Sequence, residues 1–200
     1  KLKLKYRIPY GESYKEFFKD VEISSIDKTE IDKESGLLIC PMVFNCLSLW
    51  YEESETVYTI EPSTEELRWN FRWPSRFSSY DNRSINYDNK GHTEASFKLQ
   101  INGYVKDPVI SIYTNGELIN QLDLTGVTLE IGDSLYYSTK SNELYLYKIS
   151  DGVKTNLFNS LSLLNTNFFK LPKGVSEIRL SADDDITSAK LTIFTEYKAV

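Results

Sequence analysis

Hydrophobic and polar residues alternate along most of this chain, which is the pattern of half-buried β-strands. The clearest case is the stretch 91–113, where an Asn102-Gly103 bend and an Asp107-Pro108 break separate two alternating runs. The apolar positions of these runs are Phe97, Leu99, Ile101, Ile110 and Ile112. We therefore expect two neighbouring strands, each with one face directed into a core.

The same alternation continues to the end of the chain. Turn signals at Asn115-Gly116, Asp151-Gly152 and residues 171–174 divide it at the regular spacing of a β-sandwich. A short helix or 3₁₀ turn is expected over residues 159–164. Further strands are expected at 127–131, 144–149, 175–180 and 190–197. The C-terminal part is thus predicted to be an antiparallel β-sandwich.

The first eight residues also form an alternating strand. Leu2, Tyr6 and their neighbours occupy one face, and a row of lysines with Arg7 occupies the other. This cationic row could line a pore or meet an acidic neighbour. It could also be a solvated face that protects a sheet edge, because lysines oppose edge-to-edge pairing. The sequence leaves both interpretations open.

One segment has the pattern of a short helix. Ser13 and Glu16 have the spacing of a capping box. Tyr14, Phe17 and Phe18 then form an apolar stripe at helical spacing. We expect one helix here, within a domain that is otherwise β.

Two strands are expected after this helix, at residues 21–31 and 37–51. The second carries apolar residues on both faces, which predicts burial on both sides, with a bulge or an edge position at Pro41. Cys40 and Cys46 are the only cysteines and lie on this strand. Six rises of about 3.3 Å separate them by roughly 20 Å, too far for a disulfide. We expect two buried free thiols.

The composition fits a mainly β globular protein of 200 residues, in which Tyr and Phe are abundant. A domain boundary is expected near Pro62-Ser63, with an N-terminal β domain over residues 1–62 and the sandwich over 63–200. The net charge of −6 argues against a nucleic-acid surface, and no apolar run is long enough to cross a membrane. The chain opens with alternating charge instead of a signal peptide and lacks an initiating Met, so we expect it to be cut from a longer protein.

An aromatic stripe follows the predicted boundary. Trp69, Phe71 and Trp73 share one face of a strand. An exposed row of this kind makes a stacking platform for sugar rings, whereas a buried row is part of a core or an interface. The flanking arginines suit a wet opposite face, which favours burial. The same question applies to Tyr136, Tyr137, Tyr145 and Tyr147.

No set of residues predicts catalysis, a cofactor or a metal ion. His92 is the only histidine and lies in a turn-rich segment, where we expect a surface position without a paired nucleophile. The carboxylates of residues 183–185 lack the glycine and distal glutamate of a calcium loop. Acidic residues that could pair as in glycosidases are Glu52, Glu53, Glu65, Glu66 and Glu94. Acidic loops are common, so we expect no enzyme.

Several landmarks occur together in a fixed order along the chain. They are the stretches 21–31, 38–44, 49–51, 91–113, 132–138 and 171–178. In this order they resemble the phage distal tail protein family, siphophage-type tail components with a galectin-like C-terminal domain. The resemblance implies a truncated N-terminal β domain followed by a galectin-like antiparallel β-sandwich.

The function that this resemblance implies is structural. Family members form rings, typically hexameric, at the tail tip or baseplate, between the tail tube and the receptor-binding apparatus. Self-association and contacts with other tail proteins are therefore expected, and the place in the virion is the tail tip. The alternative is a carbohydrate-binding module contacting the host cell wall. His92-Thr93-Glu94 does not match the sugar-binding strand of true galectins, so a galectin-like fold alone is no evidence for sugar binding.

Overall fold

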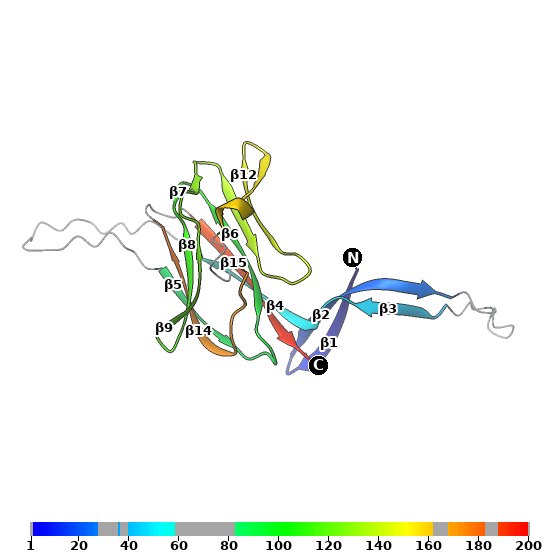
Figure 1. Ribbon diagram of the computed structural model, residues 1–200. Helices are drawn as coiled ribbons and strands as arrows, with labels where there is room; N and C mark the ends of the chain where they lie inside the picture. Colours follow the sequence, from blue (N-terminus) through cyan, green and yellow to red (C-terminus); the bar gives the residue numbers. More distant parts are fainter. Residues whose placement is uncertain are drawn as a thin grey trace, which may run out of the picture.

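The computed structural model describes residues 2–27, 36, 40–58, 83–161, 168–182 and 188–199, with the side chains of 54–58 and 83 left out. These residues form antiparallel sheets, two of which pack as a sandwich from which a β-stranded arm projects (Figure 1). The mainly β class and the sandwich expected from the alternation are confirmed.

The larger sheet has nine strands within the described ranges. Its order is β1 (Leu2–Tyr10), β2 (Ser13–Ile26), β4 (Trp50–Tyr58), β15 (Ser188–Tyr197), β6 (Ser96–Asn102), β11 (Ser134–Ser138), β12 (Tyr145–Ser150) and β13 (Val153–Asn156), and β3 (Met42–Cys46) pairs with β2. The facing sheet has the order β5 (Arg83–Asn89), β14 (Gly174–Ser181), β8 (Val109–Thr114) and β9 (Glu117–Asp123). β7 (Val105–Lys106) pairs with β10 (Thr128–Leu129), and a 3₁₀ turn spans Phe158–Ser160.

The core lies between the two sheets and is built from the alternating positions. Phe97, Leu99 and Ile101 of β6 are buried, as are Ile110 and Ile112 of β8. The polar residues between them on β6 point to the other side of the larger sheet, because successive side chains of a strand alternate. The two alternating strands predicted for residues 91–113 are therefore confirmed as β6 and β8, which belong to the two facing sheets.

Two predicted turns close hairpins of two residues. Asn115 and Gly116 join β8 to β9 with φ angles of 53° and 83°, and Asp151 and Gly152 join β12 to β13 with 49° and 76°. Positive φ at both central residues is the geometry of the type I′ turn, which matches the twist of the strands it joins.

The predicted helix at Ser13 is wrong. Residues 13–18 begin β2, which pairs with β1 from Tyr10↔Ser13 to Leu2↔Val21. The Ser13 hydroxyl donates a hydrogen bond to the carbonyl of Tyr10 (3.1 Å), so it closes the turn of a hairpin instead of capping a helix. Nine paired residues outweigh a short local preference for helix.

The long strand expected over residues 37–51 is also wrong for its described part. β3 ends at Cys46, and β4 begins only at Trp50. Met42 and Val43 are exposed, so burial on both faces is not observed. Pro41 precedes β3 and does not interrupt it, and residues 37–39 lie outside the described ranges. The strand expected at 21–31 is confirmed as far as Ile26, where β2 ends; residues 28–31 also lie outside.

The two cysteines are free, as expected, but neither is buried. Cys46 is exposed and Cys40 is partly exposed. Cys46 ends β3, in which four of five residues are exposed, and Cys40 lies just before this strand.

The expected domain boundary stays a prediction. Pro62-Ser63 and the aromatic stripe Trp69, Phe71 and Trp73 lie outside the described residues. β4, which precedes them, pairs along its whole length with β15 of the sandwich.

Candidate functional site at the junction of arm and sandwich

β1, β2 and β3 form an arm at the end of the larger sheet, beside the C-terminal end of β15 (Figure 1). Backbone pairing between the arm and β4 is confined to one pair, Phe18↔Tyr51. The ladder is thus very narrow where the arm begins. Side chains must therefore contribute to holding the arm in place.

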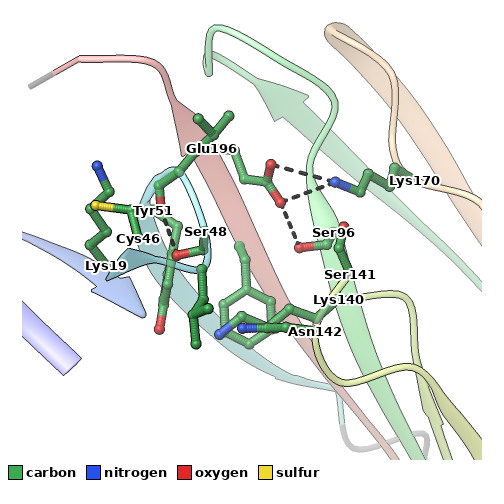
Figure 2. Close-up of a pocket in the computed structure, with 13 residues that line it drawn as sticks. Lys19, Cys46, Ser48, Tyr51, Ser96, Lys140, Ser141, Asn142, Lys170 and Glu196 are labelled. Carbon is green, nitrogen blue, oxygen red and sulfur yellow. Dashed lines mark hydrogen bonds and ion pairs between the residues drawn. The ribbon is translucent and has the colours of Figure 1, made fainter. Parts of the chain in front are cut away.

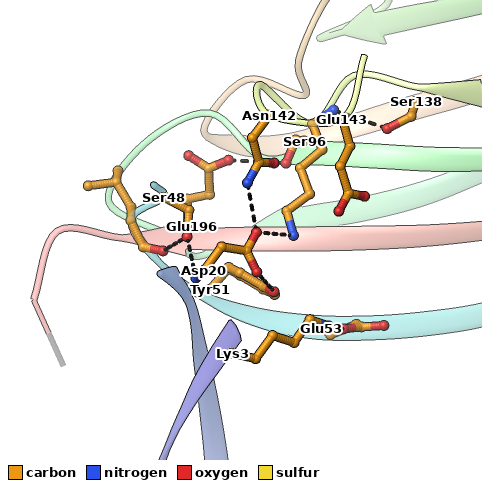
Figure 3. A network of polar contacts seen from close by, with 12 residues as sticks. Lys3, Asp20, Ser48, Tyr51, Glu53, Ser96, Ser138, Asn142, Glu143 and Glu196 are labelled. Atoms are coloured by element: carbon orange, nitrogen blue, oxygen red, sulfur yellow. Dashed lines mark hydrogen bonds and ion pairs between the residues drawn. The ribbon is translucent and has the colours of Figure 1, made fainter. Parts of the chain in front are cut away.

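A buried polar network crosses this narrow junction (Figure 3). The Oδ1 atom of Asp20 accepts a hydrogen bond from the Tyr51 hydroxyl at 2.9 Å. Its Oδ2 atom accepts one from Asn142 Nδ2 at 2.9 Å and lies 2.7 Å from Lys140 Nζ. Asp20 and Lys140 are 3% and 5% exposed. The network joins β2 to β4 and to the loop that follows β11.

The backbone of Asp20 takes part in the same junction. Its N–H donates to the Ser48 hydroxyl at 2.9 Å, and its carbonyl accepts from the N–H of Leu47 at 2.9 Å. These bonds fix the segment between β3 and β4 against β2. One residue of the arm thus makes contacts with three separate parts of the chain.

The charge of Asp20 is stabilised by its partners. Burial alone would favour the neutral carboxyl, but hydrogen bonds from Asn142, Lys140 and Tyr51 lower the pKa of Asp20 to about 2. Burial and the neighbouring Asp20 raise the pKa of the Tyr51 hydroxyl. Asp20 is therefore ionised and Tyr51 is neutral across the physiological range, which is the state that the hydrogen bonds require.

An aromatic pair forms the wall of this network. Tyr51 and Phe194 are buried and pack edge to face with ring centroids 5.5 Å apart. Lys140 Nζ lies 4.2 Å from the centroid of Tyr51 and 5.0 Å from that of Phe194. The ammonium group thus meets a carboxylate and two ring faces, which offset its removal from water.

The cationic row of β1 has carboxylate partners within the chain. Lys5 and Arg7 lie 2.7 and 2.8 Å from Glu16, and Lys3 lies 3.5 Å from Glu53. These pairs are solvent-exposed and contribute little to stability. They favour the interpretation of this row as a solvated face over a pore lining.

The arm exposes many large apolar side chains. They are Leu2, Tyr6, Tyr10, Tyr14, Ile23, Ile26, Met42 and Val43. β1 is also the terminal strand of the sheet, so one of its edges has no strand beside it among the described residues. Exposed apolar groups beside an open edge are typical of surfaces that bind another chain.

Comparisons with known proteins give a fold but no sequence relative. No protein-family model and no curated protein matches the chain. Two structures of the phage P2 baseplate in its activated conformation, with calcium and with strontium, match with TM-scores of 0.61 and 0.60 at 13% identity. Each match covers 99% of this chain and 69% of the other.

The Dit protein of phage SPP1 matches with a TM-score of 0.50 and 9% identity, over 95% of this chain and 64% of that one. That protein is described as a paradigm of the hub adsorption apparatus in phages that infect Gram-positive bacteria. This chain has the fold of phage baseplate and hub proteins. The resemblance to distal tail proteins is thereby confirmed for the fold.

The other candidate residues that the structure describes do not assemble into a site. His92 is exposed, as expected; its Nδ1 accepts from the N–H of Lys198 at 3.3 Å, and its ring meets Tyr197 edge to face. Glu53 pairs with Lys3, and Glu52 accepts a hydrogen bond from the Tyr197 hydroxyl. Glu65, Glu66 and residues 183–185 lie outside the described ranges. In the described part, no group of three or more His, Cys, Asp or Glu could hold a metal ion, and no helix is long and apolar enough to cross a membrane.

The four tyrosines singled out in the sequence occupy two different environments. Tyr137 is fully buried in the core. Tyr136, Tyr145 and Tyr147 lie on the opposite, partly exposed face of the sheet. Tyr147 is stacked on Tyr136 at 5.0 Å, and Lys154 Nζ lies 3.7 Å from its centroid. β12 lies between β11 and β13, so Tyr147 has a ring neighbour from one adjacent strand and an ammonium neighbour from the other.

Proposed function

We propose that this protein is a structural component of a phage tail tip or baseplate, where it links the tail tube to the receptor-binding apparatus. The observation that carries the proposal is the match in fold to baseplate structures over 99% of this chain and to a hub protein over 95% of it. Within the virion its place is the tail tip. Its role is assembly, which requires no catalytic residue.

We infer that the arm is the surface of self-association. Its supporting features are the open edge of β1 and the exposed apolar residues of all three strands. A second copy that adds a strand to this edge would satisfy the free backbone groups and cover the apolar side chains. Repetition of the same contact around an axis gives a closed ring, and the family resemblance leads us to expect six copies.

Light scattering and native mass spectrometry of the full-length protein test this proposal. We expect an oligomer whose population rises with concentration. The double variant Leu2→Ser/Tyr10→Ser should shift it to the monomer by at least about tenfold, because two exposed apolar contacts of β1 are lost. Val175→Ser, which removes an equally exposed apolar residue of the sandwich, serves as the control and should not shift it. A strictly monomeric protein without affinity for tail proteins would contradict the proposal.

A further inference from the structure

A cavity of about 530 Å³ opens at the junction of arm and sandwich (Figure 2). Its walls come from β2, from the segment between β3 and β4, from the loop after β11 and from the end of β15. The polar groups that matter below are Lys19, Ser96, Lys140, Ser141, Lys170 and Glu196. This volume lies within the range of ligand pockets, roughly 300–1,000 Å³.

The charge of the cavity differs from that of the whole chain. Among the described residues, Lys19, Lys140 and Lys170 line it, together with one carboxylate, Glu196. The charge of Lys140 is neutralised by Asp20, which is not itself part of the cavity lining. Lys19 lies 5.2 Å from the ring centroid of Trp50 and has no carboxylate within ion-pair distance among the described residues. Since Lys140 is paired with Asp20 and Lys170 with Glu196, Lys19 supplies the excess positive charge of the cavity, in a protein whose net charge is −6.

Glu196 shows how one wall holds a carboxylate. Its Oε1 atom accepts a hydrogen bond from the Ser96 hydroxyl at 3.0 Å. Lys170 Nζ donates to Oε1 at 3.3 Å and to Oε2 at 3.4 Å. An ammonium group has three N–H donors, so Lys170 can also donate to a second carboxylate.

We propose that this cavity binds an acidic peptide segment of a neighbouring chain, with Lys19 of the arm and Lys170 of the sandwich as its two cationic contacts. The two lysines lie on opposite sides of the cavity, so we expect an extended peptide with several carboxylates to meet both (Figure 2). Ser141 adds a hydroxyl group for a peptide carbonyl. The inference goes beyond the proposed function, because it holds whether or not the arm forms a ring.

A peptide fits the cavity better than a small anion does. The two lysines belong to different structural parts, so a ligand that meets both must extend across the cavity, which a peptide does and a small anion does not. A neighbour in an assembly also presents its segment at a high effective concentration, so modest affinity is sufficient.

The first test is a titration, followed by protein NMR, with the blocked peptide Gly-Asp-Glu-Asp-Gly. The neutral peptide Gly-Asn-Gln-Asn-Gly and inorganic phosphate are the comparison ligands. We expect the acidic peptide to bind at least about tenfold more tightly than either, because charge-assisted hydrogen bonds are lost with the neutral one. Equal binding of phosphate, or of the neutral peptide, would overturn the proposal.

Variants localise the binding. Lys19→Met/Lys170→Met should weaken it at least about tenfold, whereas the control Lys90→Met/Lys173→Met, with the same charge change outside the cavity, should not. Glu196→Gln removes the internal competitor for Lys170 and should tighten binding at least about threefold. An unchanged affinity in Glu196→Gln together with equal losses in test and control variants would show nonspecific attraction and overturn the site.

Cys46 gives a second readout, because its exposed thiol lines the cavity. In a Cys40→Ser background, the acidic peptide should slow modification of Cys46 by N-ethylmaleimide at least about threefold, and the neutral peptide should not. This readout does not depend on the variants of Lys19 or Lys170. Modification at the same rate with saturating acidic peptide would place the peptide elsewhere. The oligomer measured by light scattering is independent of these results, so a failure here leaves the proposed function standing.

Discussion

The replacement Asp20→Asn tests the junction most directly. It keeps the size of the side chain but leaves Lys140, which is 5% exposed, without its counter-charge. Removing one partner of a buried ion pair costs about 3–5 kcal/mol. Because Asn142 and Tyr51 keep some of their hydrogen bonds, we expect the free energy of unfolding at pH 7 to fall by about 3 kcal/mol.

The pH dependence gives the same reasoning a second measurement. The pKa of Asp20 falls from its ordinary value of 3.8 to about 2, which corresponds to about 2 kcal/mol. A carboxyl with a lowered pKa stabilises the fold above its unfolded-state pKa, and this stabilisation disappears as the pH falls through the folded-state pKa. The wild-type protein should therefore lose about 2 kcal/mol through Asp20 between pH 4 and pH 2, and Asp20→Asn should lack this part of the dependence.

Urea unfolding at pH 7 and in steps from pH 4 to pH 2 is the assay. Asp88→Asn is the matched control, because Asp88 pairs with Lys90 at 3.8 Å on the surface and should change stability by less than about 0.5 kcal/mol. The double variant Asp20→Asn/Lys140→Met should recover part of the loss, since it removes the orphaned charge. If Asp20→Asn costs no more than Asp88→Asn and keeps the acid dependence of the wild type, the network does not stabilise the junction.

Two further predictions follow from close packing and from exposure. A Cβ atom at Gly91 would lie 2.7 Å from the carbonyl oxygen of Glu196 and 2.9 Å from Thr195 Cγ2. Gly91→Ala should therefore lower the free energy of unfolding, measured in urea, by about 1–3 kcal/mol. An unchanged free energy would show that β15 can move away from the added methyl group without cost. Cys46 is exposed and Cys40 is only partly exposed. In the native state Cys46 should therefore react first with N-ethylmaleimide, as measured by peptide mass spectrometry. Faster labelling of Cys40 would contradict the exposure of Cys46 at the end of β3.

The sandwich could be predicted from the sequence because its strands repeat one local rule. In β6 and β8 the alternation of residues such as Phe97 and Ile110 survives in the structure, since each strand has one face on the core. The turn at Asn115-Gly116 was equally local, because its residues tolerate positive φ. The helix at Ser13 failed for the opposite reason: the pairing of β2 with β1 depends on Gly11, whose φ of 62° closes the hairpin, and no local pattern weighs that pairing against a capping box.

The junction could not be predicted, because its parts are distant in the sequence. Asp20, Tyr51 and Lys140 belong to three separate segments, and none of them forms a motif with its neighbours. A single aspartate among lysines on β2 resembles any exposed charge. Only the packing of the loop after β11 against β2 and β4 makes it a buried group.

The use of a buried ion pair at this place has a physical reason. Apolar contacts are non-directional, so a junction made of apolar side chains alone would allow the arm to rotate about its single backbone pair with β4. The Asp20 carboxylate accepts bonds from Tyr51, Asn142 and Lys140 in fixed directions, and any rotation would leave buried polar groups unpaired. The cost of burying the charges thus selects one angle of the arm. In a ring whose copies meet through their arms, that angle would set the geometry of the closed assembly, so variants of Asp20 should broaden the distribution of oligomers before they abolish association.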